Sequence, residues 1–359
     1  MQNKLNEKLS DRVSHLYFGS GEEKTKGEVL VDGVKYYYKI QGWDLCKKEM
    51  SGYGFIKKYY PVPEFLTIVR IDDIKGAVIS IYDETIGENK GLLVDIFSRG
   101  VFTGDEKEEV LKIIDFYSLV FEKTFTKSMH SASDIFFIDR IKTRIERFYD
   151  EFFIKKTEEI KNFNLNGFNV KLETGKVLSD IKEFFKDKKE TWCIISQCDP
   201  NDLNIGTKPI IFDYLAGGTN PLMAEFATLF WYSIAQGQYL SLKYNKESFH
   251  GHERMFSFQS ELVVNNGDMS FYVADSRKYF LIGYINKIVQ PLYEKALEED
   301  NWVSWYDEFK NYLAMKIIGV FDVSKMEQSD MLLSLGFLQF FYDLKVKEPN
   351  DLIRIIEKL

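Results

Sequence analysis

Apolar and polar residues alternate through much of the first eighty positions, a period-two pattern that predicts β-strands half-buried in a sheet. Asp32-Gly33 is a strong signal for a two-residue hairpin between two of these strands. Another strand is predicted to run into a glycine turn at Gly19 and Gly21. The predicted strands cover residues 15–18, 27–31, 34–40, 67–71 and 77–82. Together they predict a small antiparallel sheet.

Apolar residues recur at helical spacing in most of the remaining chain. In the segment 135–148 the apolar stripe is interpreted as core packing, whereas Arg140, Arg144 and Arg147 are interpreted as a solvated face. Residues 162–171 contain Asn and Gly and are predicted to form a loop. The predicted helices cover residues 45–56, 105–125, 135–148, 177–185, 225–242 and several segments between 279 and 359.

Two apolar runs in the middle of the chain each end near an acid. Residues 194–195 lead to Asp199, Asn204 follows five positions later, and residues 210–212 lead to Asp213. Buried strands that end in this way present polar groups at a cleft. Two carboxylates and an amide supply the hard oxygen ligands that Mg²⁺ prefers. The alternative is a surface turn whose Asp and Asn side chains only bond their own backbone.

The spacing of Asp199, four residues and Asn204, followed by an apolar run with Asp213, resembles the catalytic and metal loops of a known superfamily. This is the aminoglycoside phosphotransferase and choline kinase superfamily, the small-molecule kinases with a protein-kinase-like fold. The resemblance implies that Asp199 orients and deprotonates an acceptor hydroxyl, while Asn204 and Asp213 hold Mg²⁺. Two positions depart from the family pattern: Gln197 replaces a His, and Glu225 replaces an Asp.

A lysine and an acid in the N-terminal part fit the same resemblance. Lys39 ends the predicted third strand, and Glu49 lies on the helix that follows it. The next turn, at residues 61–63, has the sequence Pro-Val-Pro, as in the aminoglycoside kinases. The resemblance implies that Lys39 holds the α- and β-phosphates and that Glu49 holds Lys39 as an ion pair. A strand-end lysine in solvent is the alternative.

Further nucleotide contacts are implied at both ends of the sheet. Gly19 and Gly21 would let the backbone approach phosphate, although an ordinary hairpin explains them equally well. The hinge residues Tyr82, Asp83 and Glu84 would meet the adenine edge through their backbone. The implied cofactors are Mg²⁺ and ATP, with GTP as an alternative nucleotide.

The resemblance therefore predicts a bilobal α+β fold like that of protein kinases. Residues 1–82 would form a small antiparallel-sheet N-lobe, and residues 83–359 a large, mostly helical C-lobe. The expected activity is Mg²⁺-dependent transfer of a γ-phosphate to a hydroxyl of an aminoglycoside-, amino-alcohol-, sugar- or nucleoside-like molecule. A non-catalytic nucleotide-binding pseudokinase is the first alternative. A protein kinase is less favoured, because no Ala-Pro-Glu signature follows Asp213.

The composition of the chain argues against some classes of binding partner. A formal net charge of −8 argues against a nucleic-acid-binding protein. No apolar run approaches the length of a membrane span, and the N-terminus lacks the apolar core of a signal peptide. We therefore expect a cytoplasmic protein that acts on a small-molecule acceptor and has no membrane partner. The sequence does not predict an oligomeric state.

The cysteines and two of the histidines could suggest a nucleophile or a metal site, and neither role is favoured. The three cysteines are interpreted as reduced, buried thiols, and packing is favoured over a nucleophilic role for Cys198. His250 and His252 are interpreted as loop residues rather than as metal ligands.

Overall fold

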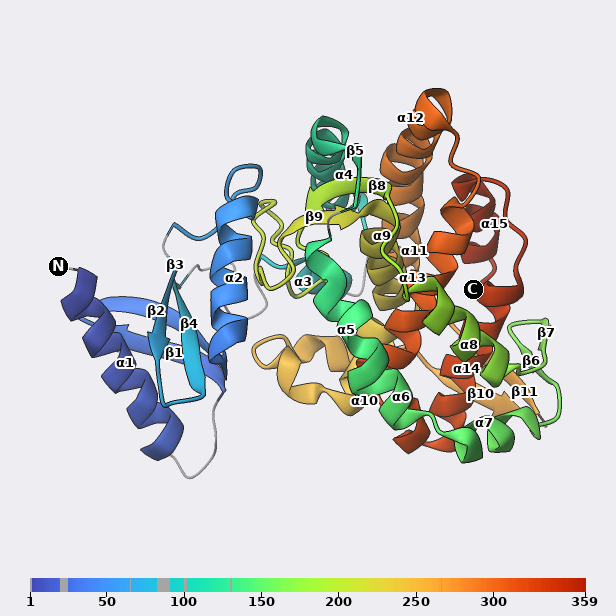
Figure 1. The fold of residues 1–359 in the computed structure, drawn as a ribbon, viewed down its shortest axis with the longest axis horizontal. Coiled ribbons are helices and arrows are strands. Elements are labelled where there is room, and N and C mark those ends of the chain that lie inside the picture. The colour runs from blue at the N-terminus through green and yellow to red at the C-terminus, as the bar shows by residue number, and fades with distance from the viewer. Residues whose placement is uncertain are drawn as a thin grey trace.

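The computed structural model describes residues 2–19, 25–64, 66–82, 91–99, 102–129, 131–265 and 267–359. It has two lobes, a small one built on an antiparallel sheet and a large one that is mostly helical (Figure 1). This is the bilobal α+β fold predicted from the sequence. The two lobes lie side by side with helix α2 (Trp43–Ile56) between the small sheet and the large lobe.

The sheet of the small lobe has four antiparallel strands in the order β1-β2-β4-β3. The β1–β2 turn carries Asp32 and Gly33, both in the left-handed region with φ of 50° and 80°. This backbone is the one expected of the Asp-Gly hairpin, which is confirmed. The strands are β1 (Lys26–Val31), β2 (Val34–Gly42), β3 (Leu66–Arg70) and β4 (Lys75–Ile81).

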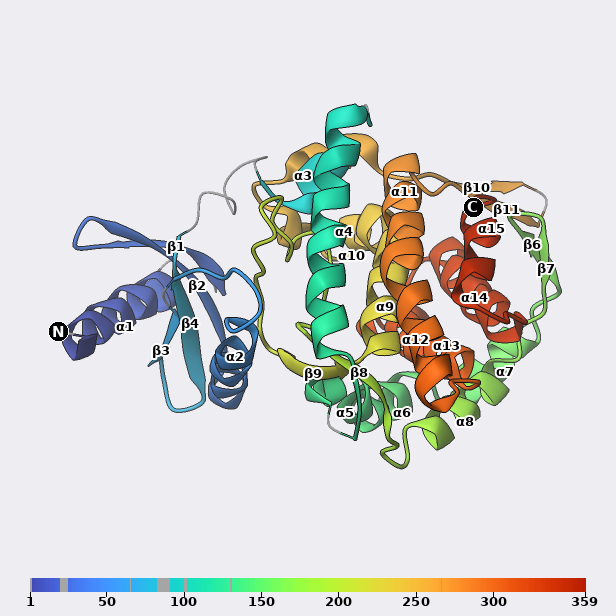
Figure 2. The ribbon, with the colours of Figure 1, turned by 90° about the horizontal axis from the view of Figure 1, so that it is seen from above.

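Helices cover both faces of this sheet. Tyr36, Tyr38 and Ile40 alternate along β2 and pack with Leu9 and Val13 of α1 (Gln2–Gly19) in one apolar cluster. Because neighbouring strand residues point to opposite faces, Tyr37 and Lys39, which lie between these residues on β2, point to the opposite face of the sheet. Figure 2 shows α1 on the outer side of the sheet and α2 on the side of the large lobe.

The predicted strand over residues 15–18 is wrong, because these residues form the last turn of α1. Leu9, Val13 and Tyr17 are buried at four-residue spacing, which places them on one helix face against the sheet. A short apolar run does not distinguish helix from strand by itself. Gly19 consequently ends a helix rather than opening a turn between strands, and Gly21 lies outside the described residues.

Most of the large lobe consists of helices packed around one apolar core. The helix predicted over residues 225–242 is present and continues as a π-helix, η4 (Tyr232–Leu240). The other helices predicted after residue 100 are also present, including the segment 135–148, which is helical from residue 138 onward. The α-helices of the lobe are α3 (Leu93–Phe97), α4 (Gly104–Thr124), α7 (Glu151–Glu158), α8 (Thr174–Phe184), α9 (Leu222–Trp231), α10 (Ser241–Tyr244), α11 (Asp275–Tyr284), α12 (Gln290–Asp300), α13 (Trp305–Val320), α14 (Gln328–Asp343) and α15 (Ile353–Ile356). Shorter helical turns are η5 (Lys246–Phe249), η6 (Glu253–Phe258), η7 (Ile285–Val289), η8 (Val323–Lys325) and η9 (Pro349–Leu352).

The helix predicted over residues 135–148 is present from residue 138 as one continuous helical run with a π-helical centre, and a 3₁₀ turn precedes it. Arg144 donates from Nη1 to the carbonyls of Gly319 and Val320, both at 2.6 Å. The interpretation of its arginines as a solvated face is therefore wrong for Arg144, which holds the segment against the end of α13, and for Arg140, whose Nη1 is buried. The 3₁₀ turn is η2 (Ala132–Phe136), and the helical run consists of α5 (Ile138–Arg140), η3 (Ile141–Ile145) and α6 (Glu146–Phe148).

Two small sheets complete the large lobe, and two sequence interpretations need correction. Residues 162–171 are not a plain loop, because they form a hairpin whose turn carries Asn166 and Gly167 with positive φ. Residues 210–212 do not form a strand and make only a single bridge, between Ile205 and Ile211. One sheet is β5 (Thr126–Ser128), β8 (Thr191–Ser196) and β9 (Gly218–Pro221). The other contains β6 (Phe163–Leu165), β7 (Phe168–Val170), β10 (Leu262–Asn265) and β11 (Asp268–Phe271).

Within the described ranges, none of the helices combines the length and the apolar character needed to cross a membrane.

Candidate active site

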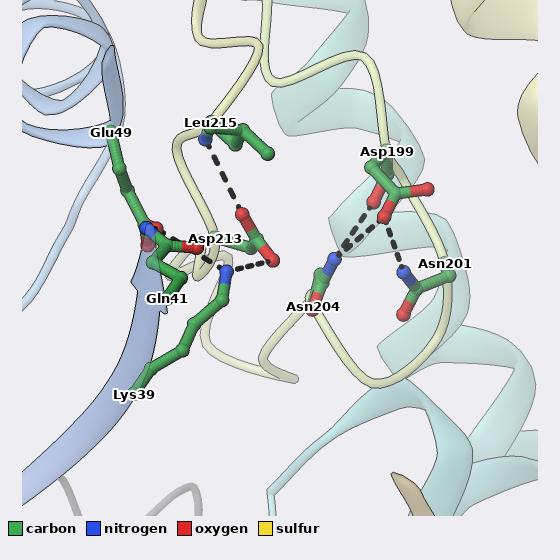
Figure 3. A network of polar contacts seen from close by, with 8 residues as sticks. All are labelled: Lys39, Gln41, Glu49, Asp199, Asn201, Asn204, Asp213 and Leu215. Atoms are coloured by element: carbon green, nitrogen blue, oxygen red, sulfur yellow. Dashed lines mark hydrogen bonds and ion pairs between the residues drawn. The ribbon is translucent and has the colours of Figure 1, made fainter. Parts of the chain in front are cut away.

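The loop after β8 holds one oxygen of Asp199 and leaves the other free of the loop. Cys198 has a φ of 55°, a left-handed backbone conformation that non-glycine residues adopt mainly where the surroundings impose it. Asn201 and Asn204 donate from Nδ2 to Asp199 Oδ2 at 3.1 Å and 3.5 Å, and Asn204 also bonds the Asp199 carbonyl at 3.1 Å (Figure 3). The turn in which Asp and Asn side chains bond one another and the local backbone is therefore present. These bonds do not involve Asp199 Oδ1, which faces another part of the molecule.

Asp199 Oδ1 faces a lysine from a distant helix. The ammonium of Lys316, on α13, lies 3.6 Å from Oδ1, and the Lys316 side chain is only 5% exposed. The Asp199 side chain is 28% exposed, so a small molecule can reach it. One carboxylate thus has one oxygen held by the loop and a second oxygen that faces Lys316.

Asp213 lies beside Asn204 although eight residues separate them in the sequence. The Phe212 amide donates to the Asn204 carbonyl at 3.0 Å, which joins the two loops. Asp213 has a φ of 60°, and its Oδ1 accepts a bond from the Leu215 amide at 3.3 Å. Burial would raise the pKa of Asp213, but the adjacent Lys39 ammonium outweighs burial and lowers the pKa. Asp213 is therefore a carboxylate at neutral pH.

Lys39 of the small lobe pairs with one acid from each lobe. Its Nζ lies 2.8 Å from Asp213 Oδ2 and 3.3 Å from Glu49 Oε2, so the ion pair with Glu49 expected from the sequence is present. Gln41 donates to Glu49 Oε2 at 2.7 Å (Figure 3). Burial alone would lower the pKa of Lys39, but the carboxylates of Asp213 and Glu49 raise it above its ordinary value. The lysine is therefore fully charged at neutral pH.

These groups line a pocket between the two lobes. Its polar part contains Lys39, Glu49, Asn204 and Asp213, whereas side chains from both lobes give it apolar walls. The other lining residues are Tyr37, Pro63, Leu66, Val78, Ser80, Leu203, Phe212 and Tyr214. A pocket with apolar walls and a few convergent polar groups is the usual form of a small-molecule site.

Helix α2 is packed tightly against the turn after Asp213. A Cβ on Gly52 would lie 1.9 Å from the carbonyl oxygen of Tyr214, so only glycine fits there. The next residue, Tyr53, contacts the Tyr214 ring edge to face at 5.3 Å between ring centroids. This contact fixes Glu49, one helical turn earlier, relative to Asp213.

Buried polar side chains form hydrogen bonds in the segment that leads into the Asp199 loop. Gln197, at the position where the resembled family has His, donates from Nε2 to the Tyr117 hydroxyl at 3.4 Å. Asn220 donates to the carbonyls of Ser196 at 3.0 Å and Ala216 at 2.8 Å. Because Asn220 bonds both segments, it ties the strand before Asp199 to the turn after Asp213.

Two further buried pairs fix the outer side of the loop. Arg277 of α11 forms an ion pair with Asp202, and both side chains are almost fully buried. His252 Nδ1 lies 2.7 Å from Asp95 Oδ1, so His252 has a structural partner, while His250 is exposed. The described residues contain no cluster of three or more His, Cys, Asp or Glu side chains that would hold a metal by itself.

Glu225 is completely buried under the Asp199 loop, at the start of α9. Burial, with a contribution from the nearby Asp199 carboxylate, raises the pKa of Glu225 to about 8. Since the folded pKa is raised from 4.5, the stability from this group is fully present below pH 4.5 and is lost as the pH rises toward 8.

We expect Glu225→Gln to flatten the pH dependence of stability. The wild-type free energy of unfolding should fall by on the order of 2–4 kcal/mol between pH 5 and pH 9 because of this group, and the variant should lack that fall. Urea unfolding of both proteins at pH 5, 7 and 9 measures this difference in the free energy of unfolding. Identical pH profiles for the two proteins would show that Glu225 ionises normally.

Not every sequence-predicted residue joins this site. Gly19 ends α1. Tyr82 directly follows β4, and the Lys35 ammonium lies 3.8 Å from the centroid of the Tyr82 ring. Gly21, Asp83 and Glu84 fall outside the described residues, so their predicted roles stay predictions. Burial raises the pKa of the Cys198 thiol well above its ordinary value, which fits the packing role rather than a nucleophile.

Sequence reasoning missed three polar residues at the site. Gln41 follows Lys39 by two positions and so shares its strand face, a signal that could have found it. Lys316 and Arg140 had no such signal, because they reach the loop from α13 and α5, far away in the sequence.

The oxygen ligands near Asn204 fit Mg²⁺. Asn204 uses its amide nitrogen for Asp199, which leaves its Oδ1, and Asp213 contributes a carboxylate held in place by the Leu215 amide. Mg²⁺ is usually bound by one or two such groups, with waters and phosphate oxygens completing the shell. One carboxylate and one amide oxygen therefore suffice only when a phosphate is also present.

Comparisons with known proteins give low similarity throughout. No family model matches the chain, and no curated protein matches it. Aminoglycoside phosphotransferase APH(4)-Ia, solved as a ternary complex with AMP-PNP and hygromycin B, is 12% identical, with 88% of this chain and 99% of that chain covered and a TM-score of 0.39. A glucosamine kinase is 10% identical, with 93% and 83% covered and a TM-score of 0.39. The chain is thus similar to solved small-molecule kinases, at values too low to transfer a function.

Proposed function

We propose that the protein is a phosphotransferase that moves the γ-phosphate of ATP or GTP to a hydroxyl of a small molecule. One observation carries this proposal. Lys39 from the small lobe joins Glu49 and Asp213 in one ion-pair network, and Asp213 lies against the loop of Asp199 and Asn204. A lysine that meets a helix acid, beside two acids and an amide on adjacent loops, is the set that phosphoryl transfer requires.

The nucleotide would occupy the pocket between the lobes. Its base would lie between the apolar walls, and its phosphates would reach Lys39, which is held by Glu49. Lys39 pairs with Asp213 at 2.8 Å, and phosphate oxygens would compete with that carboxylate for the ammonium. Glu49, buried and bonded by Gln41, would keep the ammonium in place during the exchange.

Asp199 would act on the acceptor. Its Oδ2 is held by Asn201 and Asn204, so the side chain has a fixed orientation and Oδ1 can accept the proton of the attacking hydroxyl. The transition state of phosphoryl transfer is loose, and catalysis is then mostly positioning and charge neutralisation. Mg²⁺ held by Asn204 and Asp213 would supply neutralisation of phosphate charge.

The test measures nucleotide binding and consumption. We expect ATP or GTP to bind more tightly with Mg²⁺ than without it, and we expect Asp213→Asn to remove this difference. Calorimetry with AMP-PNP, with and without Mg²⁺, measures binding, and coupled ADP formation across amines, sugars and nucleosides measures transfer. If none of ATP, GTP and AMP-PNP bound to the protein, the proposal would be overturned.

A non-catalytic nucleotide-binding protein is the second candidate. It is favoured by Gly19, one of the two glycines expected to approach phosphate, because Gly19 is the last residue of helix α1. Mg²⁺-dependent nucleotide binding without transfer to any acceptor, and with no effect of Asp199→Asn, would support this second function instead.

A further inference from the structure

Two basic side chains of the large lobe lie on the side of Asp199 opposite to the proposed nucleotide. Asp199 Oδ2 faces Asn204, whose backbone bonds the segment of Asp213, whereas Oδ1 faces Lys316 at 3.6 Å. Figure 3 shows this second oxygen pointing away from both asparagines. In the proposed reaction, the nucleotide phosphates occupy the Oδ2 side and the acceptor the Oδ1 side.

Arg140 stands next to Lys316. Its guanidinium lies 5.1 Å from the centroid of the Phe136 ring, and the Lys316 ammonium lies 5.5 Å from the same centroid. Arg140 interacts electrostatically with both Asp199 and Lys316. The two cations and Phe136 therefore form one wall, which we call the basic wall.

The basic wall has more positive charge than its neighbours neutralise. Nη1 of Arg140 is buried and has no hydrogen-bond partner among the described residues. The Lys316 side chain is 5% exposed and has the single carboxylate of Asp199 beside it. Glu225, the other nearby acid, is mostly protonated at neutral pH because burial raises its pKa to about 8. A buried lysine and a partly buried arginine thus share one carboxylate, and burial is the main cause that lowers the pKa of both groups.

Buried charge without a partner is costly, so such a group generally has a functional reason. The orphaned guanidinium nitrogen is a strong donor in a fixed position, and Arg and Lys together are the usual partners of carboxylates and phosphates. An acceptor with several ammonium groups would instead meet repulsion from the basic wall.

We propose that the phosphate acceptor carries an anionic group, a carboxylate or a phosphate, which Arg140 and Lys316 bind while Asp199 Oδ1 takes the proton of its hydroxyl. This inference rests on the proposed function and names the acceptor class for it. The expected acceptor is therefore a hydroxy acid or a sugar derivative with an acidic group, rather than an aminoglycoside or an amino alcohol.

The experiment compares probes that match in size and differ in charge. Glucuronate, glucose and glucosamine are added to the complex with AMP-PNP and Mg²⁺, and the shift in melting temperature is measured. The same three compounds are tested as acceptors with ATP. We expect glucuronate to give the largest stabilisation and the highest kcat/KM, and glucosamine the lowest.

Charge variants assign the preference to the basic wall. Lys316→Gln and Arg140→Gln should each lower kcat/KM for glucuronate by roughly 10- to 100-fold, mostly through KM, and this loss should clearly exceed the loss for glucose in the same variant. Lys316→Arg should retain the preference. Lys310→Gln is the matched control, since Lys310 lies on the same helix and pairs with Asp307.

Three results would overturn the inference while leaving the kinase function intact. The first is a preference for glucosamine or glucose, and the second is the absence of any stabilisation by glucuronate. The third is an equal loss for all three probes in Lys316→Gln, which would mean that Lys316 acts on the transferred phosphate or on Asp199 itself. Loss of AMP-PNP binding in the wild type would instead remove the proposed function.

Discussion

Asp199→Asn is expected to lower phosphate transfer by roughly 10²- to 10⁴-fold, the usual contribution of a positioned general base. The amide matches the carboxylate in size, and its oxygen can still accept the bond from Asn201, so the loop should keep its shape. The variant can no longer accept the acceptor's proton at the Oδ1 position. Nucleotide affinity should change little, because Lys39 and Asp213 are untouched. Acceptor-dependent ADP formation and calorimetry with AMP-PNP measure the two effects.

Asp187→Asn provides the matched control, since Asp187 is an exposed acid outside the site and its loss changes the net charge equally. Its activity should equal that of the wild type. If Asp199→Asn retained near-normal transfer, Asp199 would not be the base. If the variant lost nucleotide binding as well, the loop would have a structural role that the geometry does not predict.

Gly52→Ala is expected to weaken both stability and activity. The added Cβ would lie 1.9 Å from the Tyr214 carbonyl and 3.1 Å from the Gly217 amide, and both are backbone atoms that cannot rotate away. Helix α2 must therefore move from the turn after Asp213, at a cost of about 1–3 kcal/mol for overpacking. Glu49 moves with the helix, and a displacement of about 1 Å at a catalytic group can cost roughly 10²-fold in rate.

Gly54→Ala, two residues later on the same helix, is the control for this prediction. Its added Cβ would meet no atom within 4 Å, so only the backbone entropy of glycine changes. That variant should be more stable by about 0.5–1 kcal/mol, with normal transfer. Urea unfolding and ADP formation distinguish the two alanines. A Gly52→Ala protein as stable and active as Gly54→Ala would show that α2 does not need its close contact with Tyr214.

The sequence alone determined most of the local structure and predicted the central residues of the candidate site. The alternation around Lys39 and the Asp32-Gly33 turn fixed β1 and β2, since strand period and hairpin chemistry are local properties. The same is true of the Asp199 loop, where only four residues lie between the catalytic candidate and Asn204. Local spacing also brought Glu49 to Lys39, because a strand followed at once by a helix leaves few ways to pack.

Only the tertiary structure decided the groups that come from distant segments. Residues 15–18 could be strand or helix by their own pattern, and packing of Leu9, Val13 and Tyr17 on the sheet selected the helix. Lys316 looked like any lysine of an amphipathic helix, and its contact with Asp199 exists because α13 packs beneath the loop. Periodicity reports which face of an element is buried, but it does not report what that face meets. The identity of the neighbour is set by the packing of the whole chain.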